Sequence, residues 1–357
     1  MSRVSKLFLT TVLDLTLAAG IVGGDYYYNY RMPHRLPQSG MTVYAEGKSA
    51  PAAASAVSSS SAESSAAAAS AVASVSSSDS ASTGSSAVAG SWKDRFSSFF
   101  TDQVKSTDMS YSSPDIAVSI EKKSYGKGTE AVTYYIADIH IADINCLNTE
   151  FAKDTYGVGY YDGIENMSQN VNAILAINGD SYSNDKHKNS GTVIRNGIVY
   201  RTDPTQYDVC ALYQDGTMKT YGRGEFDPQQ AVKDKVLQTW IFGPSLLDAN
   251  GNMPQSYNTW DYIRETHPRS AIGYYEPGHY CMVLVDGRQT DTGYSRGMTL
   301  KELSAVFYGL GCKAAYNLDG GHSSFLTFKG RIASHPYKPG KQISDCIYIA
   351  EPQKGTA

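Results

Sequence analysis

A run of Ser and Ala residues limits how much of this chain can fold. Over residues 48–90 nearly every position is Ser or Ala, with a few Val, Gly and acidic residues. The segment has no periodic apolar face, so it cannot bury enough surface to offset the entropy lost on ordering its backbone. We therefore expect a disordered tether over residues 48–90, followed by a folded region.

The folded region is large enough for one domain. Residues 109–352 of the 357-residue chain mix apolar and polar positions, and a segment of that size can bury a sizeable core. The net charge of −4 and the lack of Lys/Arg runs in the sequence argue against a nucleic-acid partner. The five cysteines include no C-x-x-C pair, so they offer neither zinc-finger spacing nor a disulfide framework.

The first thirty residues have the pattern of a targeting segment. Residues 7–24 form a mostly apolar run, and a helix of that length approaches the hydrocarbon thickness of a bilayer. Asp14 interrupts the run, which costs about 2.5–3.5 kcal/mol at the centre of a spanning helix. We expect residues 1–30 to form a single-pass anchor in the cell membrane, with the folded domain outside. A cleaved signal segment, which would give a secreted protein, is the alternative.

Residues 91–108 carry the spacing of an amphipathic helix. Trp92, Phe96 and Phe99 recur at intervals that place them on one helical face. We predict a connecting helix over residues 91–108 that docks on the domain. A helix on a membrane surface is the alternative.

Strand patterns outnumber helix patterns in the domain. "DIAVSIEKKSYG" and "AVTYYIADIHIA" alternate as half-buried strands do, and Asn196-Gly197 predicts a hairpin. A helix is predicted over "TLKELSAVFYGLG", where Thr299 and Glu302 have the spacing of a capping box. Hairpins mixed with helix-linked strands predict an α+β fold, with a mixed, mainly antiparallel sheet and packed helices in a single domain.

Polar, glycine-rich corners follow three apolar strands. They are "LAINGD", "LVDGR" and "NLDGGHSS", and a fourth segment, "THPRSAIG", puts a His and an Arg directly before a strand. A single D-G pair usually marks a tight turn. These corners hold more polar groups than a turn needs, and loops above rigid strand ends commonly carry sites. The candidate site residues are Asn178, Gly179, Asp180, His267, Arg269, Asp286, Arg288, Asn317, Asp319, Gly320, Gly321, His322, Ser323 and Ser324.

These residue types suit chemistry on a phosphorylated sugar. Asp319 with either Asp180 or Asp286 would supply a carboxylate pair for nucleophilic or general-base work. The planar forks of Arg269 and Arg288 match phosphate oxygens.

The glycines and histidines add two further functions. Gly320 and Gly321 let backbone N–H groups approach an anion. His322 or His267 can carry a proton near neutral pH, although a lone His is more often structural.

The order of the polar segments resembles that of the phosphodiester glycosidase family, which includes the uncovering enzyme. "HPRSAIG", "VDGR", "SRGMTLKEL" and "AYNLDGGHSS" occur in the family's order and rough spacing, and the resemblance spans about residues 174–349. Asp180 and His322 stand where many family members have Gly. Both departures add a polar group to the expected site.

The resemblance implies hydrolysis of the glycosidic bond of a sugar 1-phosphodiester, which releases a sugar and a phosphomonoester. We expect the substrate in a cell-envelope glycan. Asp319 is then the expected nucleophile or base and Arg269 the expected phosphate ligand. Arg288 and Asn178 would orient the substrate. The second candidates for acid–base or metal work are Asp180, Asp286 and His322.

Two other functions stay open at this point. The glycosidase interpretation requires no cofactor, but Asp180, Asp319 and His322, together with Asp286, would suit a divalent cation in a metal-dependent phosphodiesterase. That enzyme would cleave a P–O bond. The 27 tyrosines would suit sugar stacking in a non-catalytic module that binds cell-wall polysaccharide.

Overall fold

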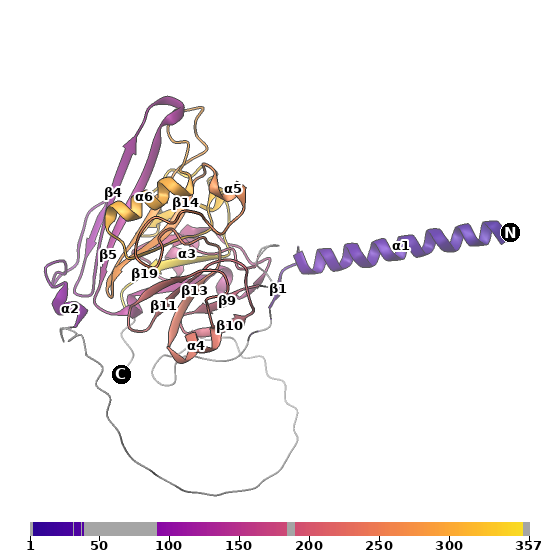
Figure 1. The fold of residues 1–357 in the computed structure, drawn as a ribbon, viewed down its shortest axis with the longest axis horizontal. Coiled ribbons are helices and arrows are strands. Elements are labelled where there is room, and N and C mark those ends of the chain that lie inside the picture. The colour runs from indigo at the N-terminus through magenta and orange to yellow at the C-terminus, as the bar shows by residue number, and fades with distance from the viewer. Residues whose placement is uncertain (1–2, 31, 37, 39–90, 184–189, 353–357) are drawn as a thin grey trace, which may run out of the picture.

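The computed structural model describes residues 3–30, 32–36, 38, 91–183 and 190–352 (Figure 1). The predicted tether at residues 48–90 lies outside the described residues. The described residues comprise one long N-terminal helix, α1 (Arg3–Tyr30), and a folded body of several sheets with short helices.

The largest sheet has seven strands, and all its strand pairs are antiparallel. Hairpin-linked neighbours stay adjacent, and the spatial order departs from the chain order at two long connections, from Ile141 of β5 to Arg269 of β14 and from Val285 of β15 through α6 to Ala314 of β16. In spatial order they are β16 (Ala314–Asn317), β14 (Arg269–Glu276), β15 (His279–Val285), β5 (Val132–Ile141), β4 (Ile116–Tyr125), β3 (Ser110–Ser112) and β2 (Lys105–Ser106).

A five-stranded antiparallel sheet packs against it. Its order is β18 (Arg331–Ile332), β17 (Leu326–Phe328), β8 (Leu175–Asn178), β19 (Asp345–Ile349) and β6 (Leu147–Phe151). Smaller antiparallel units complete the described strands: β12 (Met218–Tyr221), β11 (Val209–Tyr213) and β13 (Val236–Trp240); β10 (Ile198–Thr202) with β9 (Thr192–Arg195); and β1 (His34–Arg35) with β7 (Gly157–Val158).

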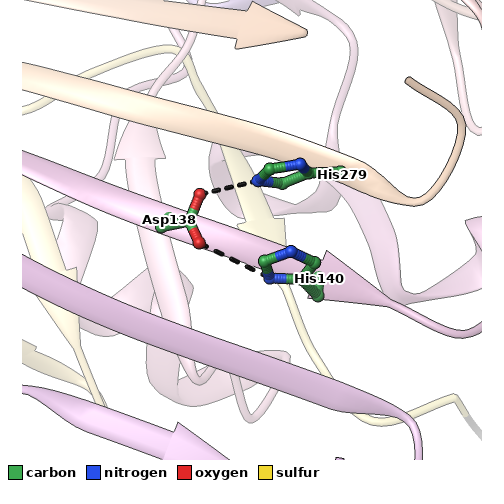
Figure 2. A group of neighbouring side chains, drawn as sticks. All are labelled: Asp138, His140 and His279. Carbon is green, nitrogen blue, oxygen red and sulfur yellow. Dashed lines mark hydrogen bonds and ion pairs between the residues drawn. The ribbon is translucent and has the colours of Figure 1, made fainter. Parts of the chain in front are cut away.

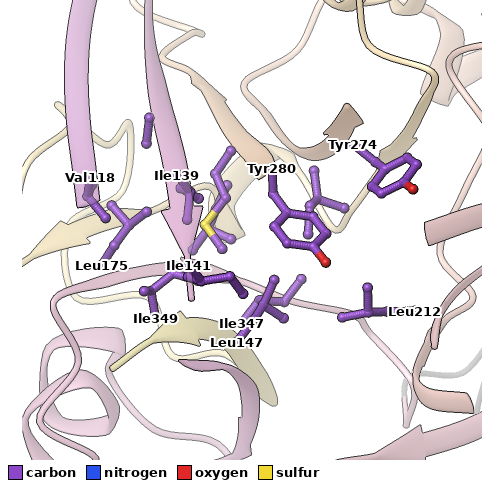
Figure 3. Packing of buried hydrophobic residues seen from close by; sticks show 14 of the residues in the cluster. Val118, Ile139, Ile141, Leu147, Leu175, Leu212, Tyr274, Tyr280, Ile347 and Ile349 are labelled. Atoms are coloured by element: carbon purple, nitrogen blue, oxygen red, sulfur yellow. The ribbon is translucent and has the colours of Figure 1, made fainter. Parts of the chain in front are cut away.

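The main core lies between the two large sheets (Figure 3). Ile139 and Ile141 of β5 share this core with Ile347 and Ile349 of β19, and all four side chains are fully buried. At about 25 cal/mol per Å² of apolar surface removed from water, such side chains each contribute about 1.5–3 kcal/mol. The alternation of apolar residues that predicts the strands therefore also identifies the face of each strand that is buried in the core.

Helices cover the outer faces of both sheets. α6 (Leu300–Leu310) packs on the seven-stranded sheet, begins with the predicted capping box at Thr299 and Glu302, and ends at Gly311. α3 (Ile164–Asn170) covers the five-stranded sheet. The other short helices are α2 (Trp92–Arg95), α4 (Pro228–Lys233), α5 (Asp261–Arg264), η1 (Gly128–Glu130), η2 (Ile144–Cys146), η3 (Ala152–Asp154) and η4 (Gly321–Ser323). The predicted α+β fold with a mainly antiparallel sheet is confirmed.

The predicted helix over residues 91–108 is only one turn long. α2 ends after Arg95, and Phe96 is buried with its ring 5.0 Å from the ring of His140. The chain then runs into β2, whose backbone pairs with β3. Burial of one aromatic ring and pairing at a sheet edge therefore replace the helical face that the spacing indicated.

Within the part of the chain that the structure describes, no helix is both long and apolar enough to cross a membrane. The predicted membrane anchor at residues 1–30 is not supported by this result. The side chains described in α1 include two carboxylates, Asp14 and Asp25. Carboxylates are among the most costly groups to place in hydrocarbon.

Candidate active site

Three of the polar segments meet at one end of the seven-stranded sheet because of its pairing. β14 runs antiparallel to both β15 and β16, with Arg269 opposite Val285 and Ala271 opposite Asn317. The start of β14 and the ends of β15 and β16 therefore share one edge. "HPR", "DGR" and "DGGHSS" come together there although they are far apart in sequence.

The five-stranded sheet brings the fourth segment to the same place. β8 ends at Asn178, whose side-chain Nδ2 donates to the Asp319 carbonyl at 2.6 Å. The Asp319 backbone N–H in turn donates to the carbonyl of Gly179 at 3.2 Å. These two bonds join the "LAINGD" and "NLDGGHSS" corners directly.

The two predicted asparagines hold the framework of the site. The Oδ1 of Asn178 accepts from the Ser270 hydroxyl at 2.5 Å and from the Phe325 backbone N–H at 3.1 Å. The Nδ2 of Asn317 donates to the Gly243 carbonyl at 2.7 Å. Both side chains are buried, and their hydrogen bonds join the loops around the site.

Asp319 is a partly exposed residue that follows a buried strand. The residues before it, Asn317 and Leu318, are fully buried. Burial is the main cause that raises the pKa of Asp319, and the nearby Asp180 carboxylate adds to it. Hydrogen bonds from the hydroxyls of Ser181 and Ser323 oppose this rise. The result is an oriented carboxylate that is more basic than an ordinary Asp.

The glycines after Asp319 allow a guanidinium to approach the loop. Gly321 has φ +64°, and a Cβ there would lie 3.3 Å from Nη1 of Arg288. A Cβ on Gly320 would lie 2.9 Å from the Pro268 carbonyl. A side chain at either position would therefore separate the "DGGHSS" loop from its neighbours.

His267 and Tyr262 position Arg288. Its Nη2 donates to the Tyr262 hydroxyl at 2.8 Å and lies 3.3 Å from Nδ1 of His267. Nε2 of His267 lies 2.6 Å from the Tyr262 carbonyl, so it carries the proton and Nδ1 is the acceptor. Burial lowers the pKa of His267, which favours this neutral form.

His322 is exposed and lies among positive charges. Its ring stacks on Tyr337, with centroids 5.3 Å apart and an interplanar angle of 12°. Desolvation lowers the pKa of His322, followed by the charges of Arg288, Lys338 and Lys341. The loop that follows Asp319 is therefore surrounded by positive charge from Arg288, Lys338 and Lys341, which favours an anionic ligand.

Arg269 lies below this surface and contacts backbone. Its Nε donates to the Met298 carbonyl at 2.9 Å, and Nη2 donates to the carbonyls of Ile263, at 2.7 Å, and Glu265. The side chain is almost completely buried, and burial lowers its pKa to about 9. These contacts tie α5 to the start of β14.

Asp180 is part of a buried ionic triad. Its Oδ2 accepts from the Ile241 backbone N–H at 2.6 Å and lies 3.6 Å from Nη2 of Arg195. Arg195 makes a closer pair with Asp345, at 2.8 Å, and Oδ1 of Asp345 accepts from the Asp180 backbone N–H at 2.6 Å. The structure thus puts Asp180 behind Asp319 and not on the surface of the site.

Asp286 points into a separate cluster at the same end of the sheet. Its Oδ2 accepts from the Tyr294 hydroxyl at 3.0 Å, and both oxygens accept from the His335 backbone N–H at 3.1 Å. Burial raises the pKa of Asp286 to about 7. The last predicted residue, Ser324, is buried, and its hydroxyl has no hydrogen-bond partner among the described residues.

The Asp286→Asn variant is expected to remove part of the pH dependence of stability. A carboxyl with a raised pKa binds a proton in the folded state that the unfolded chain releases, so its contribution falls as pH rises from about 4 to about 7. Relative to wild type, the variant should gain roughly 2–4 kcal/mol in the free energy of unfolding across that interval. Urea unfolding at several pH values measures this, and parallel curves for the two proteins would contradict it.

Three residues in or next to the site are absent from the candidates that the sequence motifs indicate. Ser181 follows the "NGD" corner directly, so its position is a signal that could have been used. Asp345 starts an apolar strand, "DCIYI", in the same way that Arg269 starts β14. Arg195 ends the apolar segment "TVIR", and a charge in such a segment indicates a buried ion pair.

The comparisons with known proteins agree with this architecture. The family model for phosphodiester glycosidase matches residues 171–350. The SPbeta prophage-derived uncharacterized protein YomE of Bacillus subtilis (strain 168) is 28% identical over 207 residues, which are 56% of this chain. The match covers 31% of that relative's length.

A solved structure shares the fold. It is the catalytic domain of zebrafish N-acetylglucosamine-1-phosphodiester alpha-N-acetylglucosaminidase, auto-inhibited by its pro-peptide. The superposition has a TM-score of 0.55 and 20% sequence identity, and it covers 67% of this chain and 84% of that chain.

Proposed function

The chain belongs to the phosphodiester glycosidase family, and from that premise we propose that its Asp319 site hydrolyses the glycosidic bond of a sugar 1-phosphodiester. The products would be a free sugar and a phosphomonoester. One observation carries the proposal: Asp319, a partly exposed residue, is two residues before Gly321, against which the Arg288 guanidinium lies, and Lys338 and Lys341 add positive charge to the same loop.

The charges of the site suit the charges of this reaction. Breaking the C1–O bond creates positive character at the sugar ring and negative charge on the departing phosphate. Phosphate leaves readily, so the leaving group needs less help from a proton donor than an ordinary sugar alcohol does. A carboxylate at the ring and fixed cations at the phosphate would stabilise both charges in the transition state.

We assign the residues to these two tasks. Asp319 acts as nucleophile or general base on the sugar side, and the hydroxyls of Ser181 and Ser323 fix its orientation. Arg288 takes the phosphate, because its guanidinium lies against Gly321 and is only half-buried. Arg269 instead holds α5 against the start of β14, since backbone carbonyls occupy its Nε and Nη2 donors.

The predicted tether and the family together also indicate a substrate class. We propose that residues 109–352 form the catalytic domain and that it acts on a phosphate-linked sugar of a cell-envelope glycan. N-acetylglucosamine is the sugar named for the zebrafish protein, so its 1-phosphodiesters are the first substrates to test.

Hydrolysis in ¹⁸O-labelled water tests the bond that is cleaved. The glycosidase reaction puts the water oxygen on C1 of the sugar, so we expect a phosphomonoester that contains no ¹⁸O by mass spectrometry. A metal-dependent phosphodiesterase would put one ¹⁸O into the phosphate and overturn the proposal. Absence of turnover with sugar 1-phosphodiesters would favour the polysaccharide-binding module.

A further inference from the structure

A second cluster of chemically active side chains lies away from Asp319. Asp138 and His140 are on β5, and His279 is on the neighbouring strand β15 (Figure 2). His279 pairs directly with His140, and Asp138 is two residues before His140, so the three side chains share one face of the sheet. The potential ligand atoms of the three residues all lie within 4.8 Å of one another.

The two imidazoles converge on the carboxylate. Nε2 of His279 lies 2.8 Å from Oδ1 of Asp138, and Nδ1 of His140 lies 3.5 Å from Oδ2. Two ligand atoms on a tetrahedral Zn²⁺ are about 3.3 Å apart, given metal–ligand distances of about 2.0–2.2 Å. The observed separations lie on either side of that value, so small side-chain movements would admit an ion.

We propose that Asp138, His140 and His279 bind one Zn²⁺ ion. Two imidazole nitrogens and one carboxylate oxygen are ligands that Zn²⁺ favours, whereas Mg²⁺ and Ca²⁺ prefer oxygen ligands throughout. Three protein ligands leave a fourth position for water. The side chains of His279 and Asp138 are 20% and 36% exposed, so solvent reaches the cluster from their side.

Aromatic side chains hold the two imidazole rings in place. The His140 ring stacks on His279 at 4.0 Å and on Phe99 at 3.8 Å, with Phe96 packed edge-on. Tyr275 stacks on the other side of His279 at 4.1 Å. This packing restricts both rings to small movements about their present orientation.

The ion would have a structural function. The cluster is at the start of β15, whereas Asp286 and the candidate active site follow its end. The strand between them is about 20 Å long at about 3.3 Å per residue. Zn²⁺ would therefore link β5 to β15 beneath Phe96 and Phe99 without touching the substrate, and this inference does not depend on the proposed function.

Metal titration of the full chain tests the site. The protein is stripped with a chelator, and Zn²⁺ is titrated against a competing chromophoric chelator. We expect one ion per chain with a Kd below about 1 μM, and a Tm about 5 °C higher with excess Zn²⁺. The His279→Phe variant keeps a stacking ring but loses the nitrogen, and we expect at least 100-fold weaker binding.

Two further variants localise the ion. Asp138→Asn should also weaken binding, and it replaces His279→Phe if that variant fails to fold. The control is His34→Gln, because His34 is a partly exposed histidine on β1, outside the proposed site. The His34→Gln variant should bind Zn²⁺ as tightly as wild type does. Zn²⁺ binding that is equally tight in the Asp138 and His279 variants would overturn the proposal, as would a wild-type Kd above about 10 μM.

Discussion

Replacement of Asp319 by Asn is expected to lower kcat/KM for a sugar 1-phosphodiester by about 10³-fold or more. The amide keeps the size of the carboxylate but carries no negative charge and cannot act as nucleophile or base. General-base contributions are typically about 10²–10⁴-fold, and loss of charge stabilisation at the sugar adds to that loss. Initial rates of sugar release over a range of substrate concentrations measure the effect.

The matched control is Asp102→Asn, the same chemical change at an exposed position before β2. It should leave kcat/KM unchanged. An Asp319→Asn protein that retains more than a tenth of the wild-type kcat/KM would remove this residue from the catalytic role.

Stability separates a catalytic function for Asp319 from a structural one. Burial and the Asp180 carboxylate both disfavour the ionised form of Asp319, since both raise its pKa. A neutral amide relieves that cost, so the inactive variant should be at least as resistant to heat as wild type. Active sites commonly reduce the stability of the fold in this way, and removal of the catalytic charge then raises that stability.

The sequence predicts which polar segments come together better than it predicts what each of their side chains contacts. The corners at Asn178, Asp286 and Asp319 follow apolar strands, and antiparallel pairing brings them to one end of the molecule. Side-chain direction depends on partners elsewhere in the chain. Arg269 contacts carbonyls near α5, which no local pattern reveals, and these contacts occupy the Nε and Nη2 donors that the predicted phosphate contact would use.

Two other features follow from pairing between distant strands. The alternation in "IADIHIA" places Asp138 and His140 on one face, but only the register of β5 with β15 adds His279. In the same way, Arg195 meets Asp345 because β9 and β19 lie near each other in the fold, 150 residues apart in sequence. Sequence periodicity identifies faces of strands, and tertiary structure decides which faces meet.

Replacement of Arg195 by Met is expected to destabilise the fold by about 3–5 kcal/mol, the usual cost of removing one partner from a buried ion pair. Arg195 is 1% exposed and donates from Nε and Nη2 to Asp345, at 3.1 and 2.8 Å. Its loss would leave the carboxylates of Asp180 and Asp345 buried together with no cation. Urea unfolding of the variant and wild type measures the difference.

The pH dependence and a second variant identify the cause. Burial, together with the Asp180 carboxylate, already raises the pKa of Asp345. Without Arg195 that pKa rises further, so the variant binds a proton when folded and its deficit is smaller at pH 5 than at pH 8. The Arg195→Met/Asp345→Asn double variant removes one buried charge and should recover part of the loss at pH 8. A deficit that is the same at both pH values would show that lost packing is responsible, not unpaired charge.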